Sequence, residues 1–191
     1  MSRLESFLFR LRILTDAQNV ISWKSDPLNL RESISECETI MRKKYPEKKI
    51  NFVTNLPADE SVESVGGRYF REVIFEVIDN AVKHSHGNDV DVNMEIVPIS
   101  PSEKVPFWRI SIADNGPGMS DILKKSLTQT FDSPERDLRK VASGLSFAST
   151  IAKHFNGRLW IEDRYKDGSR KGLIIFIEIP RYSSRRQRKK K

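Results

Sequence analysis

The chain has 191 residues, of which 38% are hydrophobic, and this size and composition suit one domain of ordinary size with some additional chain. No window of about 18 uncharged apolar residues occurs, and the charged N-terminus lacks the features of a signal peptide, so we expect neither a membrane-spanning helix nor a leader in this sequence. A single cysteine excludes an internal disulfide and a zinc site built on several thiolates. These features favour a reducing, cytoplasmic compartment.

The excess positive charge is concentrated at the C-terminus. The chain has 33 Lys and Arg against 26 Asp and Glu, a formal charge of +7, and residues 181–191 hold seven basic residues and no acid. Residues 1–180 are therefore neutral, with 26 charges of each sign, and no direct nucleic-acid partner is expected for the folded part. We expect residues 181–191 to be a basic, disordered tail, with contact to nucleic acid or anionic lipid as the alternative.

The N-terminal segment carries a heptad stripe with alternate spacings of three and four. The stripe consists of Leu4, Phe7, Leu11, Leu14, Gln18 and Ile21. Such a narrow seam needs a partner helix, so we expect residues 1–26 to be the end of a longer dimerisation or linker helix, compatible with a homodimer through this helix. Pro27 ends the helical pattern, and residues 27–180 are predicted to form the main domain.

A helix is predicted over Asn29–Lys44, followed by strands over Lys49–Thr54 and Ser61–Val65. One helix face carries Leu30, Ile34, Cys37 and Met41. Cys37 lies within this stripe, so we interpret it as a small buried hydrophobic residue, with a reactive thiol as the alternative.

The clearest helix runs from Gly66 to about His84, because apolar residues recur there at helical spacing. Alternating residues predict a strand over 89–96 and a neighbour over 108–112. We expect the intervening stretch, which holds Pro98, Pro101 and Pro106, to be a loop.

The rest of the chain is predicted as a polar loop over 127–143, a helix over Gly144–Phe155, and strands over Arg158–Glu162 and Leu173–Ile179. The last strand is continuously apolar, which predicts burial on both faces. The order of elements predicts an α/β fold: a two-layer α/β sandwich with a mixed sheet and helices on one face, preceded by a short N-terminal helix.

Three clusters carry residues suited to a nucleotide. Glu76, Asn80 and Lys83 share one edge of the central helix, where a carboxylate, an amide oxygen for a divalent cation and an ammonium for phosphate would lie side by side. The alternative is a solvated helix flank.

The second and third clusters are loops at element boundaries. The segment Asp114-Asn115-Gly116-Pro117-Gly118-Met119 ends a strand, where glycines allow close approach to a planar ligand and Asp114 can accept from an amine. An ordinary turn is the alternative. Gly144 opens a helix whose free N–H groups suit an anion. The cations of Arg136, Arg139 and Lys140 precede it.

The ordered set resembles the histidine-kinase-type ATPase superfamily. REVIFEVIDNAVKHS resembles its N box, ADNGPGM its first glycine box, and ASGLSFASTIAKHFNGRLWIED its second glycine box with the following helix and strand. The resemblance covers about residues 30–180 and implies the fold of the sensor histidine-kinase catalytic domain, which binds ATP with Mg²⁺.

The resemblance also implies residue roles. Asn80 would hold Mg²⁺, Lys83 would reach the phosphates, and His84 would lie near the nucleotide. Asp114 would accept from the adenine amino group, in a pocket shaped by Gly116, Gly118 and Met119. Gly144 and Leu145 would form the helix end that faces the phosphates, beneath a lid of residues 131–143 that supplies Arg136, Arg139 and Lys140. Glu76 matches the position that polarises the attacking group in the wider superfamily.

The chain departs from the family pattern at several positions. The second glycine box has Ala142, Gly144 and Ser146 where the family usually has three glycines, and Phe131 is what remains of a phenylalanine-containing box. Ile174 lies about where the family often has a threonine near the adenine. These departures leave ATP binding as the expectation and put the phosphate grip and lid movement in doubt.

The histidines occur only at 84, 86 and 154, so the N-terminal heptad segment has no phosphoacceptor. The resemblance therefore implies an enzyme, a protein histidine kinase, whose acceptor histidine belongs to a dimerisation domain elsewhere, with a response regulator downstream in two-component signalling. The location would be cytoplasmic, including the cytosolic part of a membrane-associated sensor. The alternatives are a degenerate nucleotide-binding regulatory module, an anti-sigma-type serine kinase and an ATP hydrolase that uses Glu76 as base.

Overall fold

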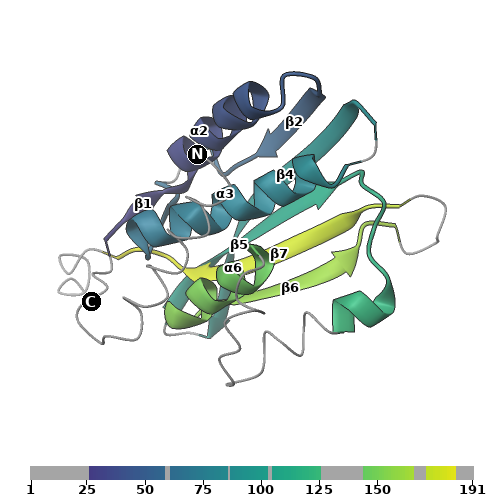
Figure 1. Ribbon diagram of the computed structural model, residues 1–191. Helices are drawn as coiled ribbons and strands as arrows, with labels where there is room; N and C mark the ends of the chain where they lie inside the picture. The colour runs from purple at the N-terminus through teal and green to yellow at the C-terminus, as the bar shows by residue number, and fades with distance from the viewer. Residues whose placement is uncertain are drawn as a thin grey trace.

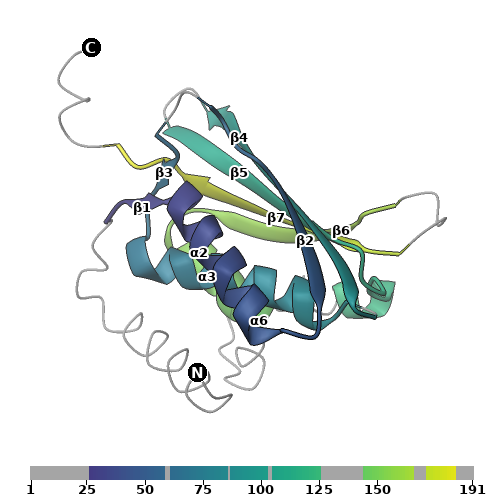
Figure 2. The same cartoon turned by 90° about the horizontal axis from the view of Figure 1, so that it is seen from above.

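The computed structural model describes residues 26–58, 61–85, 87–102, 105–125, 144–165 and 171–183. They form two layers: a five-stranded sheet and three helices that cover one of its faces (Figures 1 and 2). In chain order the elements are β1 (Leu28–Asn29), α2 (Leu30–Lys44), β2 (Lys49–Asn55), β3 (Glu63–Ser64), α3 (Gly67–Lys83), β4 (Asp89–Ser102), β5 (Val105–Asp114), α6 (Gly144–His154), β6 (Arg158–Asp163) and β7 (Leu173–Pro180). The predicted fold class is confirmed.

The sheet is mixed. Its strand order is β2-β4-β5-β7-β6, in which β2 and β4 are parallel and all other neighbours are antiparallel. The short strands β1 and β3 pair separately. Because β4, β5, β7 and β6 pair as antiparallel neighbours, the ends of β5 and β6 and the start of β7 lie at the same edge of the sheet.

The predicted helix Asn29–Lys44 is confirmed as α2, and local chemistry explains its ends. The Asn29 side chain accepts from the Glu32 amide at 3.2 Å and caps the first turn. The last turn carries Arg42, Lys43 and Lys44, whose positive charge suits the carbonyl end of a helix.

The core lies between α3 and the sheet. α3 buries a continuous stripe of apolar side chains against β5 and α6, and its predicted helical face is confirmed. The buried stripe comprises Phe70, Val73, Ile74, Val77, Ile78, Ala81 and Val82. α3 thus forms the centre of the helical layer, with α2 on one flank and α6 on the other (Figure 1).

The predicted proline-containing loop is wrong, because β4 and β5 extend through it. Pro98 pairs with Trp108, and the two strands remain paired to Ser102 and Val105. The last pair between β2 and β4 is Asn55 with Glu95, so the proline-containing end of β4 has one neighbouring strand rather than two. Proline is tolerated there, since fewer amides need a partner.

The predicted burial of β7 on both faces is only half right. Its inner face is packed under the helices, while its outer face is covered by side chains of the same sheet rather than by a second layer. Phe176 stacks on Trp160 with ring centroids 4.9 Å apart. The buried Glu178 carboxylate pairs with Arg109 at 2.7 Å and Arg158 at 2.5 Å.

The domain extends past Pro180, where the tail was expected to begin. The Arg181 amide donates to the Pro106 carbonyl, and its guanidinium lies 3.8 Å from the centre of the Trp108 ring. Residues 1–25 and 184–191, which hold the predicted N-terminal helix and most of the basic tail, lie outside the described residues. Among the described helices, none combines the length and apolar character needed to cross a bilayer.

Candidate functional site

A cavity of about 500 Å³ lies where the end of α3, the end of β5, the start of α6 and the start of β7 meet. It is lined by seven of the predicted site residues: Asn80, His84, Asp114, Gly118, Met119, Gly144 and Leu145. The three clusters, which together span more than 60 residues of sequence, therefore share one cavity. Its volume lies within the range typical of sites for small molecules and cofactors.

Asp114 is the buried acid of this cavity. Asp114 is only 7% exposed, and its Oδ1 atom accepts hydrogen bonds from the backbone amides of Gly116 at 2.8 Å and Leu173 at 3.3 Å. Burial raises the pKa of Asp114, while those amides and the charges of Arg164 and His84 act in the opposite direction. The two amides fix the carboxylate, so Asp114 is oriented to accept from a donor in the cavity.

Gly116 makes this arrangement possible. A Cβ on Gly116 would lie 2.9 Å from Asp114 Oδ1 and 3.5 Å from the His84 carbonyl oxygen. A larger residue would therefore displace the carboxylate from its amide partner. The first glycine cluster acts by making room for Asp114, as well as by lining the cavity through Gly118 and Met119.

The start of α6 packs against the polar edge of α3. A Cβ on Gly144 would overlap a Glu76 carboxylate oxygen and would lie 3.2 Å from Asn80 Nδ2. Glu76 is 7% exposed and Asn80 is half-buried, so both face the helix end rather than open solvent. The predicted side-by-side arrangement of Glu76 and Asn80 is found, and Gly144 is the residue that permits the close approach.

His84 and Lys83 differ in position although they are adjacent in sequence. His84 lines the cavity, and burial, followed by the neighbouring Lys83 charge, lowers its pKa. Lys83 is exposed on the last turn of α3 and is not among the residues that line the cavity. Glu76 also lies beside the cavity rather than in its lining. The α3 C-terminus is held by Lys48, whose ammonium donates to the Val82 carbonyl at 2.7 Å.

Several predicted site residues lie outside the described residues. They are Arg136, Arg139 and Lys140, together with the lid of residues 131–143 that was expected to carry them. The described chain stops at Lys125 and resumes at Gly144, directly at the cavity.

Sequence reasoning missed the contribution of β7. Leu173 and Ile175 line the cavity, and the Leu173 amide bonds Asp114. Ile174, which was expected near the adenine, pairs with Ala113 and points to the other face of the sheet. The alternation of side chains along a strand could have warned of this, since only one of two successive residues can face the helices.

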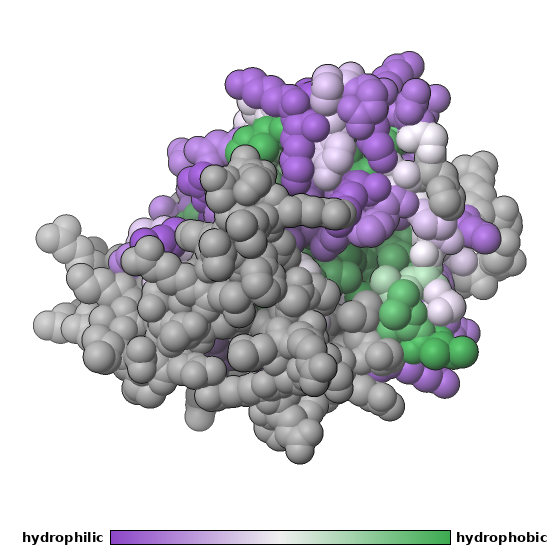
Figure 3. Space-filling view, viewed as in Figure 1, coloured by the Kyte–Doolittle hydropathy of each residue, from purple (hydrophilic) through white to green (hydrophobic). Residues whose placement is uncertain are grey.

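The segment after the first glycine cluster was also missed. Residues 121–125 form a helical turn, and Leu123 lines the cavity. Lys124 bonds Asp163 at the end of β6, which ties this turn to the sheet. Ile122 is 83% exposed and Leu123 is 50% exposed, and Figure 3 shows hydrophobic residues, in green, at the lower right, over the helical turn of residues 121–125.

Comparisons with known proteins agree with this arrangement. The chain is 24% identical over 138 residues to the adaptive-response sensory kinase SasA of Synechococcus sp. (strain JA-2-3B'a(2-13)); the match covers 70% of this chain and 35% of SasA. The chain spans about a third of the length of such relatives.

Solved structures share the fold. The mycobacterial sensor histidine kinase MprB matches with a TM-score of 0.66 and 18% identity, over 84% of this chain and all of that one. Full-length ShkA in complex with AMPPNP matches with a TM-score of 0.63 and 17% identity, over 86% of this chain and 32% of that one.

A family model described as "Histidine kinase-, DNA gyrase B-, and HSP90-like ATPase" matches residues 67–183, which include α3, both glycine clusters and β7. Since this match covers more than half of the 191 residues, the chain belongs to the family of histidine kinase-, DNA gyrase B- and HSP90-like ATPases.

Proposed function

We propose that the cavity binds ATP with Mg²⁺, and that the chain is the catalytic domain of a sensor histidine kinase that transfers the γ-phosphoryl group to a histidine outside this chain. One observation carries the proposal: a buried, amide-fixed carboxylate, Asp114, and a helix-edge amide, Asn80, line the same cavity. A purine needs a fixed acceptor for its amine, and a triphosphate needs a cation site within reach.

The adenine end of the cavity is built by Asp114, Met119 and the apolar side chains of β7. Asp114 would accept from the exocyclic amine of adenine, and its burial makes that hydrogen bond strong in a low-dielectric setting. Leu173 and Ile175 add apolar contacts to the purine ring. A guanine, which carries an oxygen at the equivalent ring position, would place an acceptor against an acceptor.

The phosphate end is built by the edge of α3 and the start of α6. Mg²⁺ prefers oxygen ligands, and the Asn80 amide oxygen supplies one next to the buried Glu76 carboxylate. The donor set therefore fits Mg²⁺, which would neutralise charge on the phosphates. The N-terminal end of α6, where Gly144 and Leu145 line the cavity, suits a phosphate oxygen, because the first N–H groups of a helix have no acceptor within the helix.

The other polar groups would act on the transferred phosphoryl group. Lys83, Arg136, Arg139 and Lys140 would offset charge that develops in the transition state. Glu76 would accept or orient a proton of the attacking group. His84 would contact the nucleotide, and burial in the cavity lowers its pKa, which favours the uncharged imidazole there.

The proposed partners follow from the acceptor. The three histidines of this chain are at 84, 86 and 154, so transfer needs a dimerisation domain that carries the phosphoacceptor, in the same longer protein or in another chain. A response regulator would then receive the phosphoryl group. Such a two-component system would place this domain in the cytoplasm.

A second candidate is ATP hydrolysis with Glu76 as the base. The observation that favours it is the burial of this carboxylate beside Gly144 at the polar edge of α3. A degenerate regulatory module is a third candidate, because Gly144 is the one glycine among Ala142, Gly144 and Ser146.

Radiolabelled ATP separates these candidates. Transfer of γ-³²P to a supplied dimerisation domain supports the kinase. Phosphate release that is lost in Glu76→Gln, with ATP affinity retained, supports the hydrolase instead. Tight ATP binding with neither transfer nor release, in the presence of every dimerisation domain tried, supports the regulatory module.

A further inference from the structure

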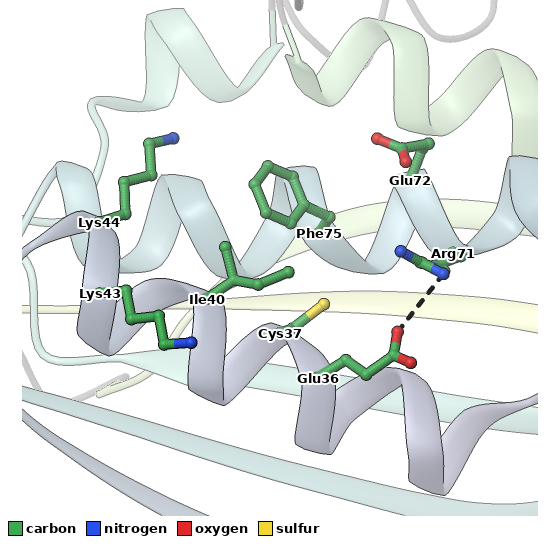
Figure 4. A pocket seen from close by; sticks show the side chains of 8 residues that line it. All are labelled: Glu36, Cys37, Ile40, Lys43, Lys44, Arg71, Glu72 and Phe75. Atoms are coloured by element: carbon green, nitrogen blue, oxygen red, sulfur yellow. Dashed lines mark ion pairs between the residues drawn. The ribbon is translucent and has the colours of Figure 1, made fainter. Parts of the chain in front are cut away.

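A second hollow, of about 440 Å³, lies on the other flank of α3, between α3 and α2 (Figure 4). Its apolar part is formed by Cys37 and Ile40 of α2 and Phe75 of α3. Charged side chains stand at both ends: the ion pair of Glu36 with Arg71 at one, and Lys43 with Lys44 at the other. We call this hollow the α2–α3 groove.

The groove exposes apolar surface that a folded domain gains by covering. Ile40 is 39% exposed, and Phe75 is half-buried, although both lie on helices whose other faces are packed in the core. Its apolar floor with charged ends matches the surface that an amphipathic helix buries when it docks in a groove.

The preceding chain enters the described structure beside this groove. The Asp26 carbonyl accepts from the Gly67 amide at 3.0 Å, which holds the chain at the start of α3. From there a shallower hollow, lined in part by Pro27, leads to the groove and shares Glu36 and Arg71 with it. Residues 1–25 are therefore tethered at the Glu36 end.

The sequence of residues 4–21 suits this groove in length. At 1.5 Å per residue, a helix of this length would span about 27 Å, and the 15-residue α2 spans about 22 Å. A turn after Ile21 would let the helix double back antiparallel to α2, as in a helical hairpin. The heptad stripe would then supply a narrow apolar face to pack on the apolar floor of the groove.

We propose that the N-terminal segment of residues 4–21 docks in the α2–α3 groove of its own chain, with its heptad stripe on Ile40 and Phe75. Docking would hold any preceding part of the protein on the α2 flank of α3, away from the cavity that Asn80 lines. The inference is independent of phosphoryl transfer.

The test is limited chymotrypsin cleavage of the full chain at Phe7 and Phe9. Ile40→Glu places a charge in the groove, and Val53→Glu, at a 52% exposed residue of β2 outside the groove, is the matched control. Ile40→Glu should speed cleavage at these sites by about tenfold, because cleavage follows the population of the undocked segment, while Val53→Glu stays within about twofold of wild type.

Two further variants test the docked face and the occupant. Leu14→Glu, which places a charge on the heptad stripe, should also speed cleavage, whereas Asp16→Lys, on the opposite face of the helix, should leave the rate within about twofold of wild type. Equal cleavage rates in wild type and Ile40→Glu overturn the proposal. So does a dimer, seen by light scattering, that Leu14→Glu dissociates and Ile40→Glu leaves intact, since the stripe would then pair with a second copy.

Discussion

The two flanks of α3 carry hollows of similar volume and different chemistry. The α6 flank, at about 500 Å³, brings together Asp114, Asn80 and the Gly144 backbone, each placed by a neighbouring element. The α2 flank, at about 440 Å³, has an apolar floor with charged side chains at its two ends, among them the ion pair of Glu36 with Arg71. Their volumes alone therefore do not indicate which hollow binds the nucleotide.

The difference shows where free energy of binding would come from on each side. A buried carboxylate held by two amides can discriminate a hydrogen-bond donor, because an unmatched partner leaves it unsatisfied. The α2–α3 groove has no such fixed group among its lining, so it can favour apolar surface of many shapes.

The largest expected effect concerns the thiol of the α2 flank. Burial raises the pKa of Cys37 from 9.0 to about 12, which lowers the thiolate fraction near pH 8 by roughly a thousandfold. Iodoacetamide should therefore label Cys37 in the folded protein far more slowly than in urea, with rates followed by mass spectrometry. Rapid labelling of the folded protein would show that the groove opens to solvent down to its floor.

The next effect concerns the α6 flank. Asp114→Asn should weaken ATP binding by more than about tenfold, because an asparagine has only one acceptor oxygen: if that oxygen accepts from the Gly116 and Leu173 amides, the NH₂ group meets the adenine amine, donor against donor. Asp89→Asn, an exposed carboxylate at the start of β4, is the matched control. Isothermal titration calorimetry measures both, and unchanged affinity in Asp114→Asn would remove this residue from the adenine site.

A substitution on the α2 flank should lower the stability of the domain and leave its ATP affinity unchanged. Phe75→Ala should lower the free energy of unfolding by about 1–2 kcal/mol, less than for a fully buried phenylalanine, because the ring is half-buried. ATP affinity should stay within about twofold of wild type. Urea unfolding and calorimetry on the same sample measure the pair, and a parallel loss of affinity would mean that the two flanks are coupled through α3.

The smallest expected effect is the pH dependence of ATP binding, where two groups of the α6 flank oppose each other. Burial raises the pKa of Asp114, so acidification protonates it at higher pH than usual and weakens binding. Burial lowers the pKa of His84, so this imidazole gains its positive charge at a lower pH than usual, and that charge strengthens binding of the anionic nucleotide.

His84→Gln should therefore lose affinity on acidification more steeply than wild type, and Asp114→Asn less steeply. Comparing variants at each pH cancels the titration of the nucleotide itself. Identical slopes in all three proteins would show that neither group titrates in contact with the ligand.

Much of the fold could be predicted because local signals agreed with it. Asn29 caps α2, and apolar residues at helical spacing mark the face of α3 that is buried. The prolines misled the prediction of β4 and β5, because a proline disfavours a strand only where its missing N–H would have had a partner. That depends on where β2 ends, which lies more than 40 residues away in sequence.

The sequence by itself determined the chemistry of the site: an acid after a strand, an amide on a helix edge and a glycine at a helix start, in that spacing. Only the tertiary structure decided their geometry. It brought Gly144 against Glu76, gave Leu173 and Ile175 to the cavity instead of Ile174, and left Lys83 outside the lining. Local preference fixes what a residue can do, whereas strand register and helix packing fix what it touches, and these are set by contacts distant in sequence.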